Sequence, residues 1–233
     1  ATLAIPEDDA KYLQDVEHFG GFVLGDLTFP KIAAAIENEE WDTLTAFFAD
    51  DFQAETFRWS DGQEHITSFG KFRTWNEENK TFRMLPDEFV SYIRELREQY
   101  SELMRCSIKV MQMAPETRGK FDEPWQGSFK LFFAGRTHAN SISQYSLRFN
   151  CRLAKINEQT PDANGIFLSV GCFSAEHATA ADFLLEDITA KTGMTSLGLR
   201  DNWKHSYEED QQRPFITGGI YANDFNQDGI TDF

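Results

Sequence analysis

Apolar residues recur at helical spacing in the first part of the chain. Residues 7–19 are polar and amphipathic and predict a first helix, which Gly20 and Gly21 are expected to interrupt. A second helix is expected to begin near Thr28 and Pro30, because proline is tolerated in a first helical turn, where its missing N–H would be unpaired anyway.

Another short helix is predicted over residues 41–48, after an acidic break at residues 38–40. It is expected to end at the pair Asp50 and Asp51, whose carboxylates suit a helix terminus and turn. Residues 52–58 should then be extended. Two short helices followed by a strand are therefore expected before residue 60.

The clearest helical pattern begins at Pro86, after a charged region at residues 60–80 that follows neither period. Its apolar positions recur at intervals of four, three, four and three, which describes one face of a helix about four turns long. These positions are Phe89, Ile93, Leu96, Tyr100 and Leu103.

After this helix the apolar period changes to two, which is typical of strands. Asn164 and Gly165 form a turn dipeptide between the last two strands, so these strands should pair antiparallel. Helices followed by a run of long strands indicate an α+β domain. The alternating positions are Ile108 and Val110; Phe129, Leu131 and Phe133; Tyr145, Leu147, Phe149, Cys151 and Leu153; and Ile166, Leu168, Val170 and Cys172.

The composition is that of a folded, acidic protein. Hydrophobic residues make up 41% of the 233 residues and include 22 Phe, while the formal charge is −16. Such a charge opposes binding to nucleic acid and to anionic lipid head groups. The sequence lacks a run of about 18 to 20 uninterrupted apolar residues, so membrane insertion is not expected.

Three cysteines, Cys106, Cys151 and Cys172, lie in apolar alternating runs without metal-ligand spacing. Buried free thiols are the simple interpretation. A cross-strand disulfide between Cys151 and Cys172 is the alternative.

The order of these elements resembles the nuclear-transport-factor-2-like (SnoaL-like) superfamily over roughly residues 21–178, with the phrase IENEEWDTLTAFFADDF as its most specific part. The resemblance implies a curved sheet wrapped around helices. Such a sheet forms a conical pocket that in different relatives binds steroids, polyketides or peptides, or a domain that simply dimerises.

Relatives that are enzymes use a His and Asp pair or an Asp and Arg network inside the cone, because proton abstraction needs a base with a tuned pKa. The corresponding candidates here are Asp51, His65, Tyr145, Arg148 and His177. Each also has a structural explanation. Arg148 is expected on the polar, solvated face of its strand, Tyr145 on the packed apolar face, and His177 after the last strand.

The chain ends in an oxygen-rich loop. Its D-x-N-x-D-G-x-x-D spacing places oxygen ligands at alternate positions, as calcium requires, and Gly229 permits the sharp turn. The expected ligands are Asp224, Asn226, Asp228, the carbonyl of Ile230, and Asp232. An Asx-rich turn without metal is the alternative.

The pieces DFLLEDITAKTGM (residues 182–194) and ITGGIYANDFNQDGITDF resemble the entry into the cartilage acidic protein (ASPIC/UnbV) group of VCBS and FG-GAP repeat proteins. The resemblance implies an extracellular or periplasmic protein whose repeats form propeller blades. Three parts are therefore expected: an N-terminal extension (1–20), the cone-shaped α+β domain (21–180), and a linker with an incomplete first repeat (181–233).

Together these features favour a non-catalytic ligand-binding or protein-interaction module of a periplasmic or secreted calcium-binding repeat protein. The alternative is a small-molecule isomerase, cyclase or dehydratase that uses an acid/base residue in the cone. The partner would be a small apolar ligand or a protein. A third hypothesis is a homodimer that forms through a polar sheet face made of Gln144, Ser146, Arg148 and Asn150.

Overall fold

The computed structural model describes residues 7–76, 78–79 and 81–183. The chain divides into two units, residues 1–184 and 185–233, and all described residues belong to the first. The expected calcium loop, including Asp224, Asn226, Asp228, Ile230 and Asp232, lies outside the described residues.

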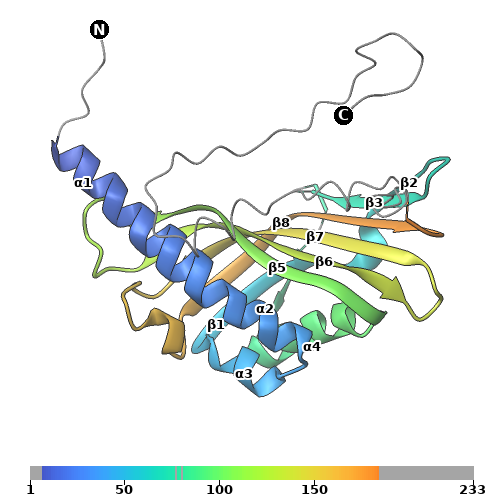
Figure 1. The fold of residues 1–233 in the computed structure, drawn as a ribbon, viewed down its shortest axis with the longest axis horizontal. Helices are drawn as coiled ribbons and strands as arrows, with labels where there is room; N and C mark the ends of the chain where they lie inside the picture. The colour runs from blue at the N-terminus through green and yellow to red at the C-terminus, as the bar shows by residue number, and fades with distance from the viewer. Residues whose placement is uncertain (1–6, 77, 80, 184–233) are drawn as a thin grey trace, which may run out of the picture. The chain divides into compact units, whose positions relative to one another are not determined.

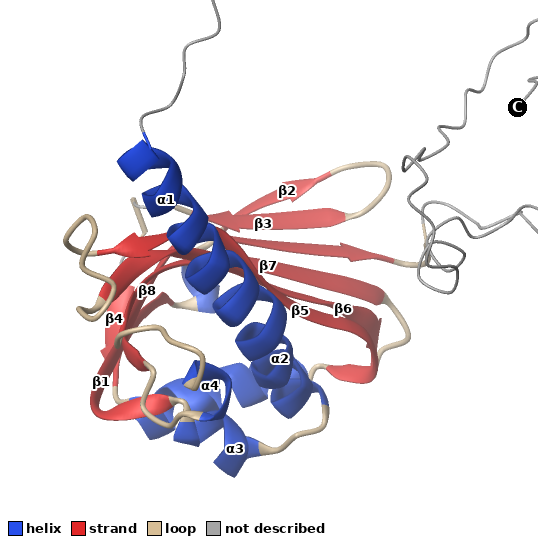
Figure 2. Ribbon diagram, turned by 60° about the vertical axis from the view of Figure 1, so that its left-hand side comes forward, coloured by secondary structure: helices blue, strands red, loops and turns tan. Residues whose placement is uncertain are grey.

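One long helix opens the described part and lies against one face of the sheet (Figures 1 and 2). It consists of α1 (Glu7–Val16), a wider π-type segment η1 (Glu17–Thr28) and α2 (Phe29–Glu37). The expected break at Gly20 and Gly21 is therefore wrong. The Thr28 hydroxyl donates to the carbonyl of Val23, five residues back, at 2.7 Å, which adds a side-chain hydrogen bond across the wider turn.

Glycine serves close packing in this helix and does not end it. A Cβ on Gly20 would lie 3.2 Å from the Cβ of Met113 on the sheet. Residues 8–37 are long and apolar enough to span a bilayer, but the core helix of a globular domain meets the same criteria. Half of this apolar window is buried within the protein.

Two shorter helices complete the helical layer. They are α3 (Trp41–Ala46) and α4 (Pro86–Arg97). The Glu88 carboxylate accepts the backbone N–H of Leu85 at 2.8 Å, which fixes the start of α4. The predicted extension of this helix to Leu103 is wrong: Tyr100 and Leu103 keep the helical spacing but belong to the next strand, where pairing across the sheet satisfies their backbone.

Eight strands form one curved sheet with the order β2-β3-β8-β7-β6-β5, and β1 pairs with β4 and β8. The long strands follow the predicted alternation, and β7 and β8 are antiparallel as expected, with Gly165 at φ +68° in their connection. The bounds are β1 (Phe48–Phe57), β2 (Gln63–Ile66), β3 (Lys71–Trp75), β4 (Thr81–Met84), β5 (Tyr100–Pro115), β6 (Trp125–Thr137), β7 (Ile142–Leu153) and β8 (Phe167–Ala180), with short 3-10 turns at Trp59–Asp61 (η2) and Thr160–Asp162 (η3).

The sheet bends around α2, α3 and α4, which produces the expected cone-shaped α+β architecture (Figure 2). Aromatic rings fill the space between the two layers. Phe149 stacks on Phe129 at 5.2 Å between ring centroids and meets Phe89 edge-on at 6.0 Å. The apolar faces predicted for the helices and the strands thus pack together in a single core that is rich in phenylalanine.

All three cysteines are free thiols. Cys151 is paired in register with Val170, while Cys172 is opposite Phe149, so the alternative of a cross-strand disulfide is wrong. Burial raises the pKa of each thiol to about 12, which keeps the thiols protonated and unreactive.

Candidate functional site in the cone

Only two of the five predicted catalytic residues come together. Tyr145 on β7 and His177 on β8 are direct partners in the sheet, and their rings stack 3.9 Å apart at an angle of 2°. His177 lies within β8, so the prediction that it follows the last strand is wrong. Both side chains face the helical side, in the same row as Arg73 on β3 and Phe133 on β6.

The other three candidates lie elsewhere. Asp51 is exposed on β1 and does not end a helix, because Asp50 and Asp51 are already within the strand. His65 is exposed on β2. Arg148 lies on the outer face of the sheet, as predicted, with its guanidinium 4.0 Å from Glu176. These residues therefore belong to no common site.

An aromatic cluster surrounds the Tyr145 and His177 pair. Trp59 stacks on Tyr92 at 5.3 Å and meets the ring of Tyr145 edge-on at 5.3 Å. Trp75 packs edge-on against Trp59 at 4.9 Å. Sequence reasoning missed Trp59 because residues 60–80 gave no periodic signal from which its neighbours could be placed.

The polar atoms of this cluster are mostly committed to one another. Tyr145 donates its hydroxyl hydrogen to Gln99 at 2.8 Å, and His177 Nε2 is 3.0 Å from the Ser143 hydroxyl. Thr56 donates to the Tyr92 hydroxyl at 2.8 Å. Among the described residues, the Trp59 indole N–H is buried without a partner. The cluster is thus largely satisfied internally.

Burial dominates the electrostatics of these groups. Burial and, as the smaller cause, the nearby Arg73 guanidinium together lower the pKa of His177 to about 4. Burial raises the pKa of Tyr145, although its bond to Gln99 acts in the opposite direction. At neutral pH the pair is therefore an uncharged imidazole on an uncharged phenol.

Arg73 supplies the positive charge beside this pair. Its guanidinium donates to Glu64 at 2.9 Å, so a carboxylate partner already neutralises it. Among residues 7–183 that the structure describes, three or more His, Cys, Asp or Glu side chains nowhere gather as a metal site would require.

The part of the cone that the described residues line is nearly solid. The cavity between helices and sheet measures about 30 Å³ and has only apolar lining, including Ile36, Phe89, Phe149 and Val170. A site for a drug-sized ligand usually measures about 300 to 1,000 Å³. The aromatic core therefore occupies the space in which a substrate would be enclosed.

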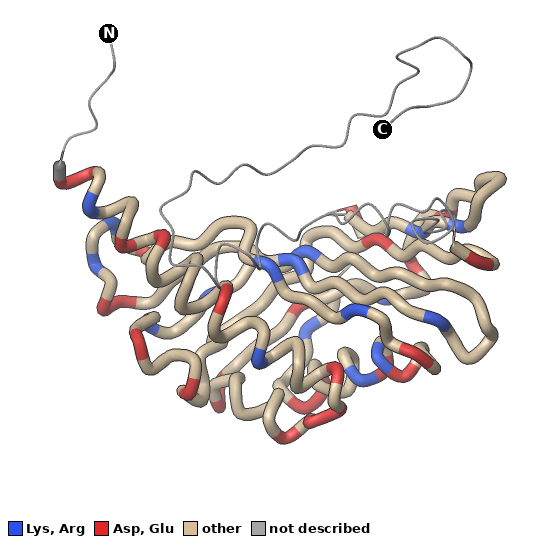
Figure 3. Tube along the Cα trace, viewed as in Figure 1, with Lys and Arg blue, Asp and Glu red and all other residues tan. Residues whose placement is uncertain are grey.

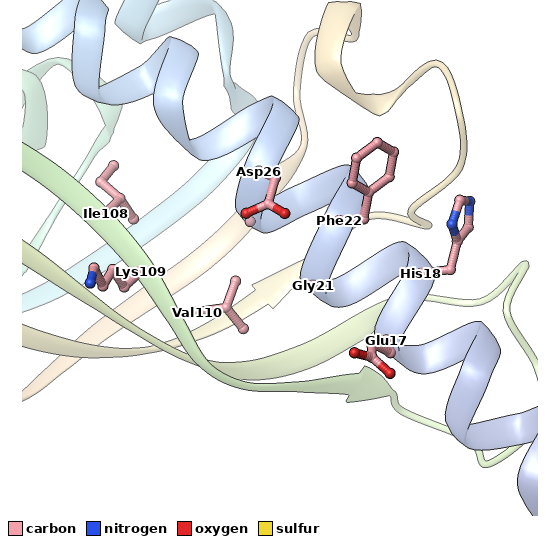
Figure 4. A pocket seen from close by; sticks show the side chains of 9 residues that line it. Glu17, His18, Gly21, Phe22, Asp26, Ile108, Lys109 and Val110 are labelled. Atoms are coloured by element: carbon pink, nitrogen blue, oxygen red, sulfur yellow. The ribbon is translucent and has the colours of Figure 1, made fainter. Parts of the chain in front are cut away.

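A larger hollow of about 470 Å³ lies outside the cone, between η1 and β5 (Figure 4). Glu17 and Asp26 reach it from the helix, and Lys109 and Val110 from the strand. It is open on one side and lies along the edge of the sheet, which is a geometry suited to a docking segment and not to an enclosed reaction.

Comparison with known proteins gives a fold-level likeness only. No protein-family profile matches the chain, and no curated protein matches its sequence. An NTF2-like protein from Exiguobacterium sp. 255-15 superposes with a TM-score of 0.36 and 12% identity, covering 64% of this chain and 95% of that one.

Two further solved structures give similar values. A protein described as a SnoaL-like polyketide cyclase from Shewanella putrefaciens CN-32 has a TM-score of 0.33 and 10% identity, covering 62% of this chain and 84% of its own. The beta subunit of the benzoate 1,2-dioxygenase from Burkholderia mallei has a TM-score of 0.35 and 11% identity, with 80% and 98% covered. These superpositions are loose, and none identifies a function for this chain.

Proposed function

We propose that the described domain is a non-catalytic interaction module. The observation that carries this proposal is the filled cone, whose residual cavity of about 30 Å³ has no polar lining. An enzyme of the isomerase or cyclase type must enclose its substrate and place an acid or base against it. A space comparable to a single water molecule cannot admit such a substrate.

The state of His177 supports the same proposal. A general base works best when its pKa is near the operating pH, whereas the pKa of His177 is about 4. Its Nε2 is also occupied by the Ser143 hydroxyl at 3.0 Å. His177 is therefore a weak base that is already engaged.

The alternative function is a small-molecule isomerase, cyclase or dehydratase. One observation favours it: Tyr145 and His177, a potential donor and a potential base, lie in contact on the inner face of the sheet. In that case the aromatic cluster would have to open to admit substrate, and His177 would take the proton while Tyr145 stabilised the developing negative charge.

The wider setting of the module is proposed from the C-terminal sequence. The D-x-N-x-D-G-x-x-D spacing from Asp224 to Asp232 supports a calcium-binding loop at the beginning of a repeat region. Calcium loops of this kind suit a periplasmic or secreted protein, where calcium is abundant. We therefore infer an extracytoplasmic, calcium-dependent binding protein.

Calorimetric titration with progesterone and with benzene tests the proposal for the cone. The intact protein should give no saturable heat with either compound. The variant Phe149→Ala, in which a ring is removed from the core, should take up benzene and serve as the positive control. Saturable progesterone binding by the intact protein that Tyr145→Phe and His177→Gln both weaken would instead establish the enzyme-type pocket.

A further inference from the structure

Three cations line a hollow on the outer face of the sheet. The alternation of β5 turns Ile108 toward the core, so Arg105, Ser107 and Lys109 lie on the opposite face. Lys130 and Phe132 extend this row on the neighbouring strand β6, where Lys130 is paired in register with Lys109. The five side chains enclose about 220 Å³. We call this feature the basic hollow.

The basic hollow stands out against a charge of −16 for the chain. Figure 3 shows Lys and Arg positions grouped across the sheet, with many Asp and Glu positions along the helices and loops below it. Within the described part of the chain, Arg105, Lys109 and Lys130 make no ion pair, although most other basic side chains do. Three cations held together with no carboxylate partner among the described residues favour an anionic partner.

Phe132 gives the basic hollow a preformed geometry. The Arg105 guanidinium and the Lys130 ammonium each lie 5.5 Å from the centre of its ring. Cation–π contacts of this kind hold the two charges close to one aromatic ring. Next to it, the Ser146 hydroxyl is buried without a partner among the described residues, and Ser146 pairs in register with Phe132.

The site is elongated along an edge strand. Lys109 lines both the basic hollow and the hollow between η1 and β5. Among the described strands, β5 ends the sheet order and pairs with β6 alone. The six residues from Arg105 to Val110 extend roughly 17 Å at about 3.3 Å per residue, the length of a short extended peptide. Edge strands offer unpaired backbone groups to such a peptide.

The far end of this track has a different chemistry. Gly21 and Gly25 carry no side chains, so the surface of η1 is recessed at these positions, and Phe22 beside them is 47% exposed. Glu17 and Asp26 also line that end and would repel carboxylates there. A ligand with acidic groups throughout would therefore fit only the half of the track near Lys130.

We propose that this track, from the basic hollow to the Gly21–Gly25 surface, docks an extended polypeptide segment of a partner protein, with carboxylates at one end and an apolar side chain at the other. The carboxylates bind Arg105, Lys109 and Lys130, and the apolar side chain packs over the glycines. This inference rests on the proposed function as an interaction module and names the chemistry of its partner. Nucleic acid fits less well, because the overall negative charge opposes an extended polyanion.

Fluorescence anisotropy with a fluorescein-labelled peptide, two phenylalanines followed by four aspartates, tests the docking. Lys109→Glu should weaken binding about tenfold or more, as loss of a charge contact and gain of a repulsion predict. Lys71→Glu is the matched control, because it changes the net charge equally at an exposed position on β3, which β8, β7 and β6 separate from β5. Its effect should be less than about twofold, and binding should weaken as salt increases.

Three results would overturn the proposal. Equal weakening by Lys71→Glu and Lys109→Glu would mean that the peptide responds only to net charge. Equally tight binding of a labelled oligothymidylate, with the same dependence on Lys109, would assign the track to nucleic acid. A dimer in sedimentation that Lys109→Glu dissociates would make this face the homodimer interface expected from Gln144 and Arg148.

Different results would refute the proposed filled cone and the proposed docking track. A chain that binds progesterone in the cone but also binds the peptide at Lys109 would refute the filled cone and keep the docking track. A chain that binds neither would keep the filled cone and refute the track. Thermal denaturation of these charge variants, which alter exposed side chains, should give midpoints within about 2 °C of the unmodified protein.

Discussion

Removing the ring of Phe149 should reveal how strongly the filled cone stabilises the domain. Phe149 is fully buried on β7, stacks on Phe129 and meets Phe89 edge-on. Phe→Ala changes in cores cost about 3 to 5 kcal/mol. Two aromatic contacts, each contributing about 0.5 to 1.5 kcal/mol beyond buried area, place Phe149→Ala near the upper end of that range.

The rigidity of the surrounding sheet supports this magnitude. β7 is paired along its length with β6 on one side and β8 on the other, so the backbone cannot collapse into the space left by the ring. At about 24 cal/mol per Å³, the existing void of about 30 Å³ costs only about 0.7 kcal/mol. The intact core is therefore close to full packing, and most of the new volume remains empty.

Urea unfolding followed by circular dichroism measures this loss. The midpoint should fall while the slope m stays constant, because the surface exposed on unfolding hardly changes. Phe69→Ala is the control, since Phe69 is 69% exposed, and it should stay within about 0.5 kcal/mol. A loss below about 2 kcal/mol for Phe149→Ala would contradict a tightly filled cone. Phe149→Leu, with a smaller loss, serves if the alanine variant does not fold.

Three further predictions follow from the titratable groups and the C-terminal loop. NMR titration of His177 should give a midpoint near pH 4. Because burial lowers its pKa from 6.5, the unfolded chain binds the proton at a higher pH than the folded chain, so stability should fall as the pH drops from about 6.5 toward 4. His177→Gln should lessen that loss of stability. Cys106, Cys151 and Cys172 should react with a thiol reagent such as Ellman's reagent only after denaturation, and fewer than three thiols in urea would refute the free state. Calcium calorimetry should give heat that Asp228→Ala abolishes, and equal heats in both chains would refute the loop assignment.

Several features of the fold could be predicted from local pattern. The alternation from Tyr145 to Leu153 and the spacing from Phe89 to Leu96 each depend only on neighbouring residues, and both elements are confirmed. The wrong predictions concern places where contacts between distant parts of the chain determine the secondary structure. Gly20 and Gly21 lower helix propensity locally, but contact with Met113 on the sheet favours a continuous helix.

The candidate sites show the same division. Tyr145 and His177 were candidates separately, yet only the register of β7 against β8 places one ring on the other. Arg105 and Lys109 alternate visibly with Cys106 and Ile108, so the face they share was readable from the sequence. Their meeting with Lys130 required the pairing of β5 with β6.

The helix-then-sheet order, the acidic charge, free cysteines as the simple interpretation, and the core-facing side of each long strand could all be predicted without coordinates. These properties depend only on composition and on spacing along the chain. Only the folded chain shows that the cone is filled, that Asp51 and His65 are remote from His177, and that three cations gather on the outer face. Those outcomes depend on strand register and ring packing between residues far apart in sequence, and the local pattern does not encode them.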